Sequence, residues 1–160
     1  MLKPISKPKV GAVTGRFAIV ASRYNSHYVD ALLRAAKKEL RGAGVKDLEI
    51  VRVPGAYEIP VVAARLATVR RPALAAIICL GVILRGQTTH AQHVAEAVSL
   101  ALAQLQVERE LPVIHGVLLF ENTEQARVRC LGKEHNRGTE AARTALEMSR
   151  VMASIQPKAE

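Results

Sequence analysis

The chain has 160 residues, of which 49% are hydrophobic, 23% charged and 3% aromatic, as expected for one soluble globular domain. Its longest uncharged run, 13 residues from Pro72 to Leu84, is shorter than the roughly 20 needed to cross a bilayer. The net charge of +9 is spread along the chain, without the basic and aromatic stripe typical of nucleic-acid binding. Nucleic-acid and membrane partners are therefore not expected, whereas an anionic small substrate fits the charge.

The N-terminal segment contains lysines and prolines but no apolar core of a secretion signal. Cys79 and Cys130 lie far apart and in no metal-binding spacing, which indicates a reduced, cytoplasmic setting. We expect residues 1–15 to be flexible and residues 16–156 to form a single domain.

Short β-rich runs and longer helical runs alternate from the start of the domain. Residues 16–22 predict a strand, and apolar residues at helical spacing over 29–40 predict a helix. A side-chain oxygen of Asn25 or Ser26 is expected to cap this helix, and Gly42 is expected to end it.

The middle of the chain continues this alternation. Residues 47–53 predict a second strand, and Pro60 suits the first turn of a helix that runs to about Thr68. Residues 74–84 are apolar without alternation, as in a parallel strand covered on both faces. A helix is expected from about Thr89 to Glu108. Its inward side chains should be Val94, Val98, Leu102 and Leu105.

The last third of the chain predicts one strand and two helices. Residues 111–120 form the fourth strand, 123–130 a short helix, and a long helix runs from Gly138-Thr139 towards Ile155. Alternating strands and helices predict a flavodoxin-like, three-layer α/β/α sandwich with a four-stranded parallel sheet and helices on both faces.

Ligands of open α/β sheets bind beyond the carboxyl ends of the strands. The four predicted strand ends carry SRYNSH, VPGAYEIP, RGQTTHAQH and FENTEQARVR. In the third, Gly86 permits a tight turn, and the amides of Gln87, Thr88 and Thr89 should face outward at a helix start, where an anion can bind. The competing interpretation is that Thr88 or Thr89 merely caps the helix.

His90 follows in the first helical turn, where an imidazole suits proton transfer, although a lone histidine is more often structural. His90 and His93 lie three residues apart and raise the question of a metal, but no nearby Asp, Glu or Cys completes a ligand set. The sequence also lacks GxGxxG, GxxxxGK[ST] and GxSxG, so dinucleotide, P-loop and hydrolase functions lack their key residues.

The strand ends together resemble the lumazine synthase family of riboflavin biosynthesis. The matching stretches are RFAIVASRYN, VPGAYEIP, LGVILRGQTTH, PVIHGV, ENTEQA and NRGTEAARTALEM. The resemblance implies that 5-amino-6-(D-ribitylamino)uracil condenses with 3,4-dihydroxy-2-butanone 4-phosphate to give 6,7-dimethyl-8-ribityllumazine, phosphate and water. It implies no metal and no organic cofactor, and a protein whose main task is positioning.

Matched positions imply a role for each site residue. His90 transfers protons, Gln87 and Thr88 bind phosphate, and Arg129 is the cationic phosphate partner. The other implied substrate-binding residues are Tyr24 and Asn25 after the first strand, Ala56, Tyr57 and Glu58 for the ribityl chain, the backbone of Val82, Ile83 and Leu84 for the pyrimidine, and His115 and Arg137. For Glu58, a helix-start carboxylate is the alternative.

Four positions depart from the family pattern. Ala91 and Gln92 stand where an aromatic residue and Asp commonly follow the histidine, His115 replaces an aromatic residue from a neighbouring subunit, and Arg137 replaces Lys. A non-catalytic or weakly active, shell-forming paralogue that binds flavin or lumazine is therefore the alternative function.

The resemblance also implies an assembly. The family forms homopentamers with active sites between adjacent subunits, and some members build sixty-subunit shells. The connection at 132–138 carries no obvious insertion, so the sequence is compatible with a sixty-subunit shell. Riboflavin synthase is a further implied partner, and the N-terminal segment is implied to add a strand to a neighbour's sheet.

Overall fold

The core of the fold is a parallel sheet with the strand order β2-β1-β3-β4. The computed structural model describes residues 3, 13–69 and 72–155. The strands are β1 (Arg16–Ser22), β2 (Asp47–Val53), β3 (Leu74–Leu84) and β4 (Val113–Phe120). All three neighbouring pairs are parallel.

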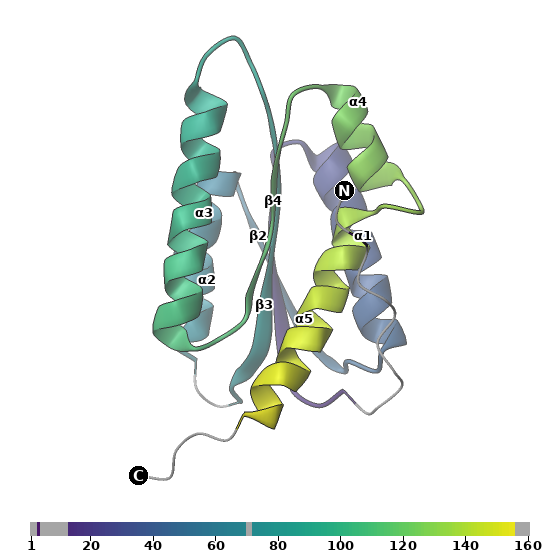
Figure 1. The fold of residues 1–160 in the computed structure, drawn as a ribbon, viewed down its shortest axis with the longest axis vertical. Coiled ribbons are helices and arrows are strands. Elements are labelled where there is room, and N and C mark those ends of the chain that lie inside the picture. The colour runs from purple at the N-terminus through teal and green to yellow at the C-terminus, as the bar shows by residue number, and fades with distance from the viewer. Residues whose placement is uncertain (1–2, 4–12, 70–71, 156–160) are drawn as a thin grey trace.

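Helices cover both faces of the sheet (Figure 1). On one face lie α2 (Ile59–Ala67) and α3 (His90–Arg109), and on the other lie α1 (Ser26–Gly42) and α5 (Arg137–Ser154). Three short elements complete the chain: η1 (Ala56–Glu58), α4 (Thr123–Ala126) and a π-helical turn, η2 (Arg127–Leu131). The three-layer α/β/α fold predicted from the sequence is confirmed.

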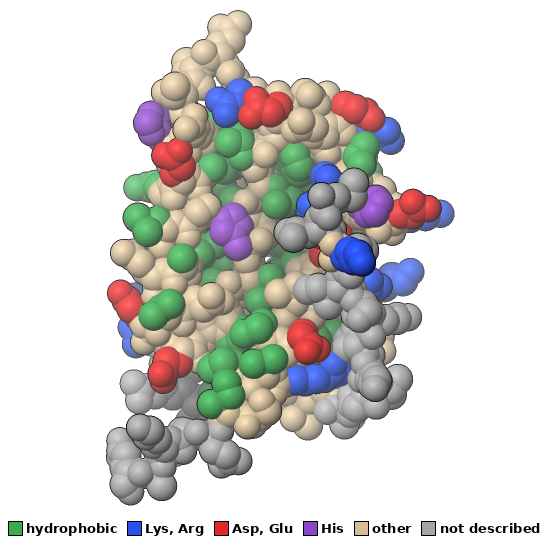
Figure 2. Space-filling view, in the orientation of Figure 1, with side chains coloured by type: hydrophobic (Ala, Val, Ile, Leu, Met, Phe, Trp, Pro, Cys, Tyr) green, Lys and Arg blue, Asp and Glu red, His purple; other side chains and the backbone are tan. Residues whose placement is uncertain are grey.

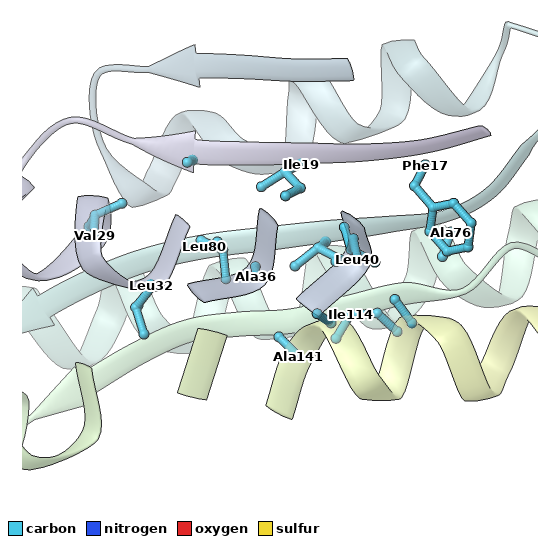
Figure 3. Close-up of a cluster of buried hydrophobic side chains, with 14 of the residues drawn as sticks. Phe17, Ile19, Val29, Leu32, Ala36, Leu40, Ala76, Leu80, Ile114 and Ala141 are labelled. Atoms are coloured by element: carbon cyan, nitrogen blue, oxygen red, sulfur yellow. The ribbon is translucent and has the colours of Figure 1, made fainter. Parts of the chain in front are cut away.

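Each face of the sheet packs its own apolar cluster. Alternate residues of β1 serve the two faces: Phe17 and Ile19 pack towards α1 and α5, whereas Ala18 and Val20 pack towards α2 and α3. Figure 3 shows the first cluster, in which Leu32 and Leu40 of α1 lie over the sheet. All of these side chains are fully buried, so β1 is a central strand that both helical layers hold in place.

Most predicted elements are confirmed, with differences at their ends. Gly42 is the last residue of α1, and the left-handed glycine that follows is Gly44, with φ +94°. The fourth strand begins at Val113 rather than at residue 111. The expected short helix at 123–130 is divided between α4 and η2.

Two further differences concern single side chains. Asn25 occupies the N-cap position of α1, but its side chain makes no capping bond. Val94 is only half-buried, whereas the other three predicted inward residues of α3 are buried. The expected flexibility of residues 1–15 falls mainly outside the described residues. Among those described, no helix is long and apolar enough to cross a membrane.

Gly138 allows α5 to approach α1 closely. A Cβ atom at Gly138 would overlap the backbone carbonyl of Leu32 in α1. We therefore expect Gly138→Ala to lower the free energy of unfolding by about 1–3 kcal/mol, as overpacking does. Urea unfolding followed by circular dichroism measures this loss.

Gly42→Ala is the matched control, because a Cβ at this helical position meets nothing within 4 Å. It should be neutral or stabilise the protein by about 0.5–1 kcal/mol. Equal losses for the two variants would contradict the close-packing argument.

Candidate active site

The site begins where β3 runs past β1. The pairing of β1 with β3 ends at Leu80, but β3 continues to Leu84, paired with β4 alone. The last four residues of β3 therefore have no strand partner on the β1 side, and their backbone groups there need another hydrogen-bonding partner. Strand order also reverses between β1 and β3, which is where open α/β sheets bind ligands.

A cavity of about 650 Å³ opens at this point, within the size range of ligand pockets. We call it the switch-point cavity. It combines residues from the ends of β1, β2 and β3 with one side of α3. Nine of the predicted site residues line it: Tyr24, Asn25, Ala56, Tyr57, Glu58, Val82, Ile83, Leu84 and His90.

Asn25 joins two walls of the cavity. Its backbone is left-handed, with φ 56°, and its Nδ2 donates a hydrogen bond of 2.8 Å to the carbonyl oxygen of Val82. The side chain expected to cap α1 therefore ties the loop after β1 to the end of β3. One lone pair of the Val82 carbonyl is thus already engaged. Successive residues of a strand direct their backbone groups to opposite sides, and Arg85 bonds towards β4, so Ile83 also faces β4 and Leu84 has the freer backbone groups on the open side.

Tyr24 lies across the mouth of the same cavity. Its backbone N–H donates to the carbonyl oxygen of Pro54 at 3.0 Å, which links the loops after β1 and β2. The ring lies so close to Gly55 that a Cβ there would come within 2.8 Å of Cδ2 of Tyr24. Because the side chain is 68% exposed, a planar ligand has access to it, and stacking is the interaction that such a ring favours.

Glu58 makes the helix-start contact and also lines the cavity. Its Oε2 accepts a hydrogen bond of 2.9 Å from the N–H of Gly55, the helix-start contact expected of a carboxylate there. The residue also lines the cavity. Because a carboxylate has about four acceptor positions, a ligand hydroxyl could share the group with Gly55.

His90 is the first residue of α3, and it is exposed on the cavity wall. Thr89 occupies the N-cap position without a side-chain capping bond, while Oγ1 of Thr88 accepts a long bond of 3.4 Å from the N–H of His90. Gln87 and Thr88 are exposed in the preceding turn and do not line the cavity. The start of this 20-residue helix therefore has little side-chain capping, as an anion site requires.

An ion pair holds that turn in place. Nε of Arg85 lies 2.7 Å from Oε2 of Glu121, just after β4. The N–H of Arg85 donates to the carbonyl oxygen of Phe120 at 2.9 Å. The turn before His90 is thus anchored to the end of the neighbouring strand.

The remaining predicted residues lie at a second cavity of about 630 Å³, which we call the β4-edge cavity. His115, Arg129 and Arg137 line it, together with residues of β4 and α5. Figure 2 views the molecule from the side on which β4 lies between α3 and α5. Within a single chain, Arg129 therefore does not line the switch-point cavity that contains His90. The expectation that one crevice of the chain holds both residues is wrong. Arg137 is also engaged, with Nη1 lying 2.6 Å from Oε2 of Glu140.

A serine on α3 orients His115. Oγ of Ser99 donates to the carbonyl oxygen of Ala95 at 2.7 Å and lies 2.7 Å from Nε2 of His115. A hydroxyl has one proton, so Nε2 must be the donor in the second contact. Desolvation lowers the pKa of His115, and a hydrogen bond to its own backbone carbonyl partly opposes this shift.

Sequence reasoning missed Gly55 and Ser99, and considered His93 only as a metal ligand. Gly55 lies against Tyr24, Ser99 bonds to His115, and His93 lines the switch-point cavity. Tertiary packing rather than any local motif sets these contacts.

Among the described residues, no group of three His, Cys, Asp or Glu side chains could hold a metal. Burial raises the pKa of Cys79 and that of Cys130 to about 12, so both thiols stay protonated near neutrality.

The lowered pKa of His115 predicts a pH-dependent stability. In the window just below its ordinary value of 6.5, the folded protein binds fewer protons than the unfolded chain. The free energy of unfolding should therefore fall as the pH drops through this window. Melting temperatures at about pH 7.5 and about pH 5.5 should differ less for His115→Gln than for the unchanged protein.

The exposed His27 of α1 supplies the control. His27→Gln should retain the full pH dependence. If His115→Gln retained it as well, another group would be responsible.

Comparison with known proteins agrees with this geometry. Residues 14–153 match the family model described as 6,7-dimethyl-8-ribityllumazine synthase. A protein of that name from Stenotrophomonas maltophilia (strain K279a) is 41% identical over 89% of this chain and 92% of its own length. One from Xanthomonas campestris pv. campestris (strain B100) is 43% identical over 87% and 90%. The chain therefore belongs to the 6,7-dimethyl-8-ribityllumazine synthase family of riboflavin biosynthesis.

Proposed function

We propose that this protein condenses 5-amino-6-(D-ribitylamino)uracil with 3,4-dihydroxy-2-butanone 4-phosphate in the cytoplasm, releasing 6,7-dimethyl-8-ribityllumazine, phosphate and water. The observation that carries the proposal is the switch-point cavity, where His90 lies beside an unpaired strand edge and an exposed tyrosine ring. The same cavity contains nine residues that the family resemblance assigns to the substrates. No metal or organic cofactor has a step in this reaction.

The pyrimidine substrate is proposed to enter along β3. Its polar edge would lie along residues 82–84, where Val82 and Leu84 direct their backbone groups to the side that β1 leaves unpaired. Its ring would stack on Tyr24, and its ribityl chain would run past Ala56 and Tyr57 towards the carboxylate of Glu58. This placement satisfies the free backbone groups, which otherwise require water.

The phosphorylated substrate is proposed to lie at the start of α3. The exposed turn at Gln87 and Thr88 directs backbone N–H groups and the positive end of the helix dipole towards a phosphate. Arg129 would add a charge-assisted bond from a second copy of the chain, because in its own chain it lies at the β4-edge cavity. The proposed assembly is a homopentamer, of which twelve would form a sixty-subunit shell that can hold riboflavin synthase.

The chemistry proposed for His90 is proton transfer. The uracil amine attacks the ketone, water leaves to give an imine, and phosphate is eliminated. The ribitylamino nitrogen then attacks the remaining carbonyl, and the ring closes with loss of a second water. Each step moves protons between nitrogen, carbon and oxygen atoms, and an imidazole can do this near neutral pH. Holding the two substrates side by side supplies the rest of the rate enhancement.

One observation favours the alternative function, a flavin-binding or lumazine-binding relative without turnover. The family pattern has an Asp where Gln92 stands, and the amide of Gln92 donates to Glu96 at 2.9 Å. His90 thus has no carboxylate next to it on the helix. This alternative predicts tight binding of ribityl compounds, with product formation indifferent to His90→Asn.

The direct test mixes the purified protein with both substrates and follows the absorbance of the lumazine. We expect a rate above the uncatalysed background, which His90→Asn lowers by about 10²-fold or more, as loss of a general acid–base does. The smaller amide keeps the polarity of the wall but cannot exchange a proton near neutral pH. Product formation at the background rate by the unchanged protein would refute the proposal.

The phosphate assignment makes a second, selective prediction. Arg129→Ala removes a charge-assisted bond of about 1.5–3 kcal/mol, so KM for the butanone phosphate should rise about 10-fold to 100-fold while KM for the pyrimidine changes little. The control is Arg127→Ala, because the exposed Arg127 pairs with Glu124 at 2.7 Å on the surface. Equal effects of Arg129→Ala on both substrates would contradict the assignment.

A further inference from the structure

α3 presents two histidines to the switch-point cavity. Its residues on the cavity wall are His90, Ala91, His93, Val94 and Ala97, so only the two imidazoles among them titrate. The N–H of His93 donates to the carbonyl oxygen of Thr89 at 3.1 Å, which places both histidines in the first helical turn. Side chains three residues apart are neighbours on a helix surface.

The nearest carboxylate on α3 is turned away from them. Gln92 and Glu96 bond to each other at 2.9 Å, and neither lines the cavity. Three titratable side chains face the histidines from other elements: Tyr24 after β1, and Tyr57 and Glu58 of η1. The carboxylate of Glu58 is held at Gly55, and tyrosine hydroxyls stay protonated near neutrality.

An imidazole can donate or accept a proton near neutral pH. Two imidazoles on one wall of the cavity can therefore offer a proton donor and a proton acceptor to the same bound substrates.

We propose that His93 is a second proton-transfer residue, which shares the acid and base roles with His90. This inference rests on the proposed function. It gives the reaction both a proton donor and a proton acceptor on one side of the substrates, at a site where Gln92 supplies no carboxylate.

Imine formation illustrates the exchange. In the carbinolamine, one histidine donates its proton to the hydroxyl, and the C–O bond breaks as water leaves. The other histidine removes the proton from nitrogen, and the N–H electron pair forms the C=N bond. The two histidines together hold one proton before and after this step, but the proton has moved to the other ring. In a later step the donor and acceptor roles are therefore exchanged.

Two matched variants test the inference. His93→Asn removes the second imidazole from the cavity wall. His27→Asn replaces an exposed histidine of α1 that does not line the cavity, so it is the control and should keep the kcat and KM of the unchanged protein.

Kinetics of the same variants test the catalytic role. His93→Asn should lower kcat by about 10-fold to 100-fold with KM for both substrates little changed, and it should remove one limb of the pH profile. The double variant should be hardly worse than His90→Asn, because groups that act as a unit are not additive. An unchanged kcat, or a loss confined to KM, would overturn the inference. An active unchanged protein whose kcat survives His93→Asn would refute this inference alone, whereas product formation at the background rate by the unchanged protein would refute the proposed function.

Discussion

β3 is longer than its neighbour β1, and its last four residues have β4 on one side and no strand on the other. Polar backbone groups cannot be left buried without partners, so this edge must face water or a ligand. Asn25 keeps the gap open, because its amide bonds to Val82 where a longer β1 would have continued the ladder. The cavity, the placement of Tyr24 and the direction of α3 all depend on this interruption of the sheet.

Polar site residues occupy two separate regions of one chain. The switch-point cavity has the histidines, Glu58 and the free strand edge, whereas the β4-edge cavity has Arg129 and the Ser99-oriented His115. Apolar side chains are spread over the face of the molecule seen in Figure 2, and on α3 both Leu100 and Val107 are more than half exposed. The proposed pentamer would bury such side chains and bring the two cavities of neighbouring copies together.

Much of the fold follows from the sequence because its signals are local. The apolar run at 74–84 and the helical spacing before Gly42 reflect burial, which the sheet and its layers confirm. The site was harder to predict, because the same side chain can serve two purposes. Asn25 is suitable as a cap, and only the tertiary structure shows that its amide prefers the carbonyl of Val82. The pairing of Ser99 with His115 joins residues from a helix and a strand, and no local pattern predicts such a contact.

The central claim is that neighbouring copies complete each site. Mixing two impaired subunits, assayed at a butanone phosphate concentration well below KM, tests it most directly. His90→Asn damages the switch-point cavity, and Arg129→Ala damages the β4-edge cavity. When equal amounts are unfolded and refolded together, random assembly should pair intact cavities in some sites and restore about a quarter of the wild-type rate. Each variant refolded alone should remain near its own low rate. A mixture no more active than the mean of the two variants would contradict the account.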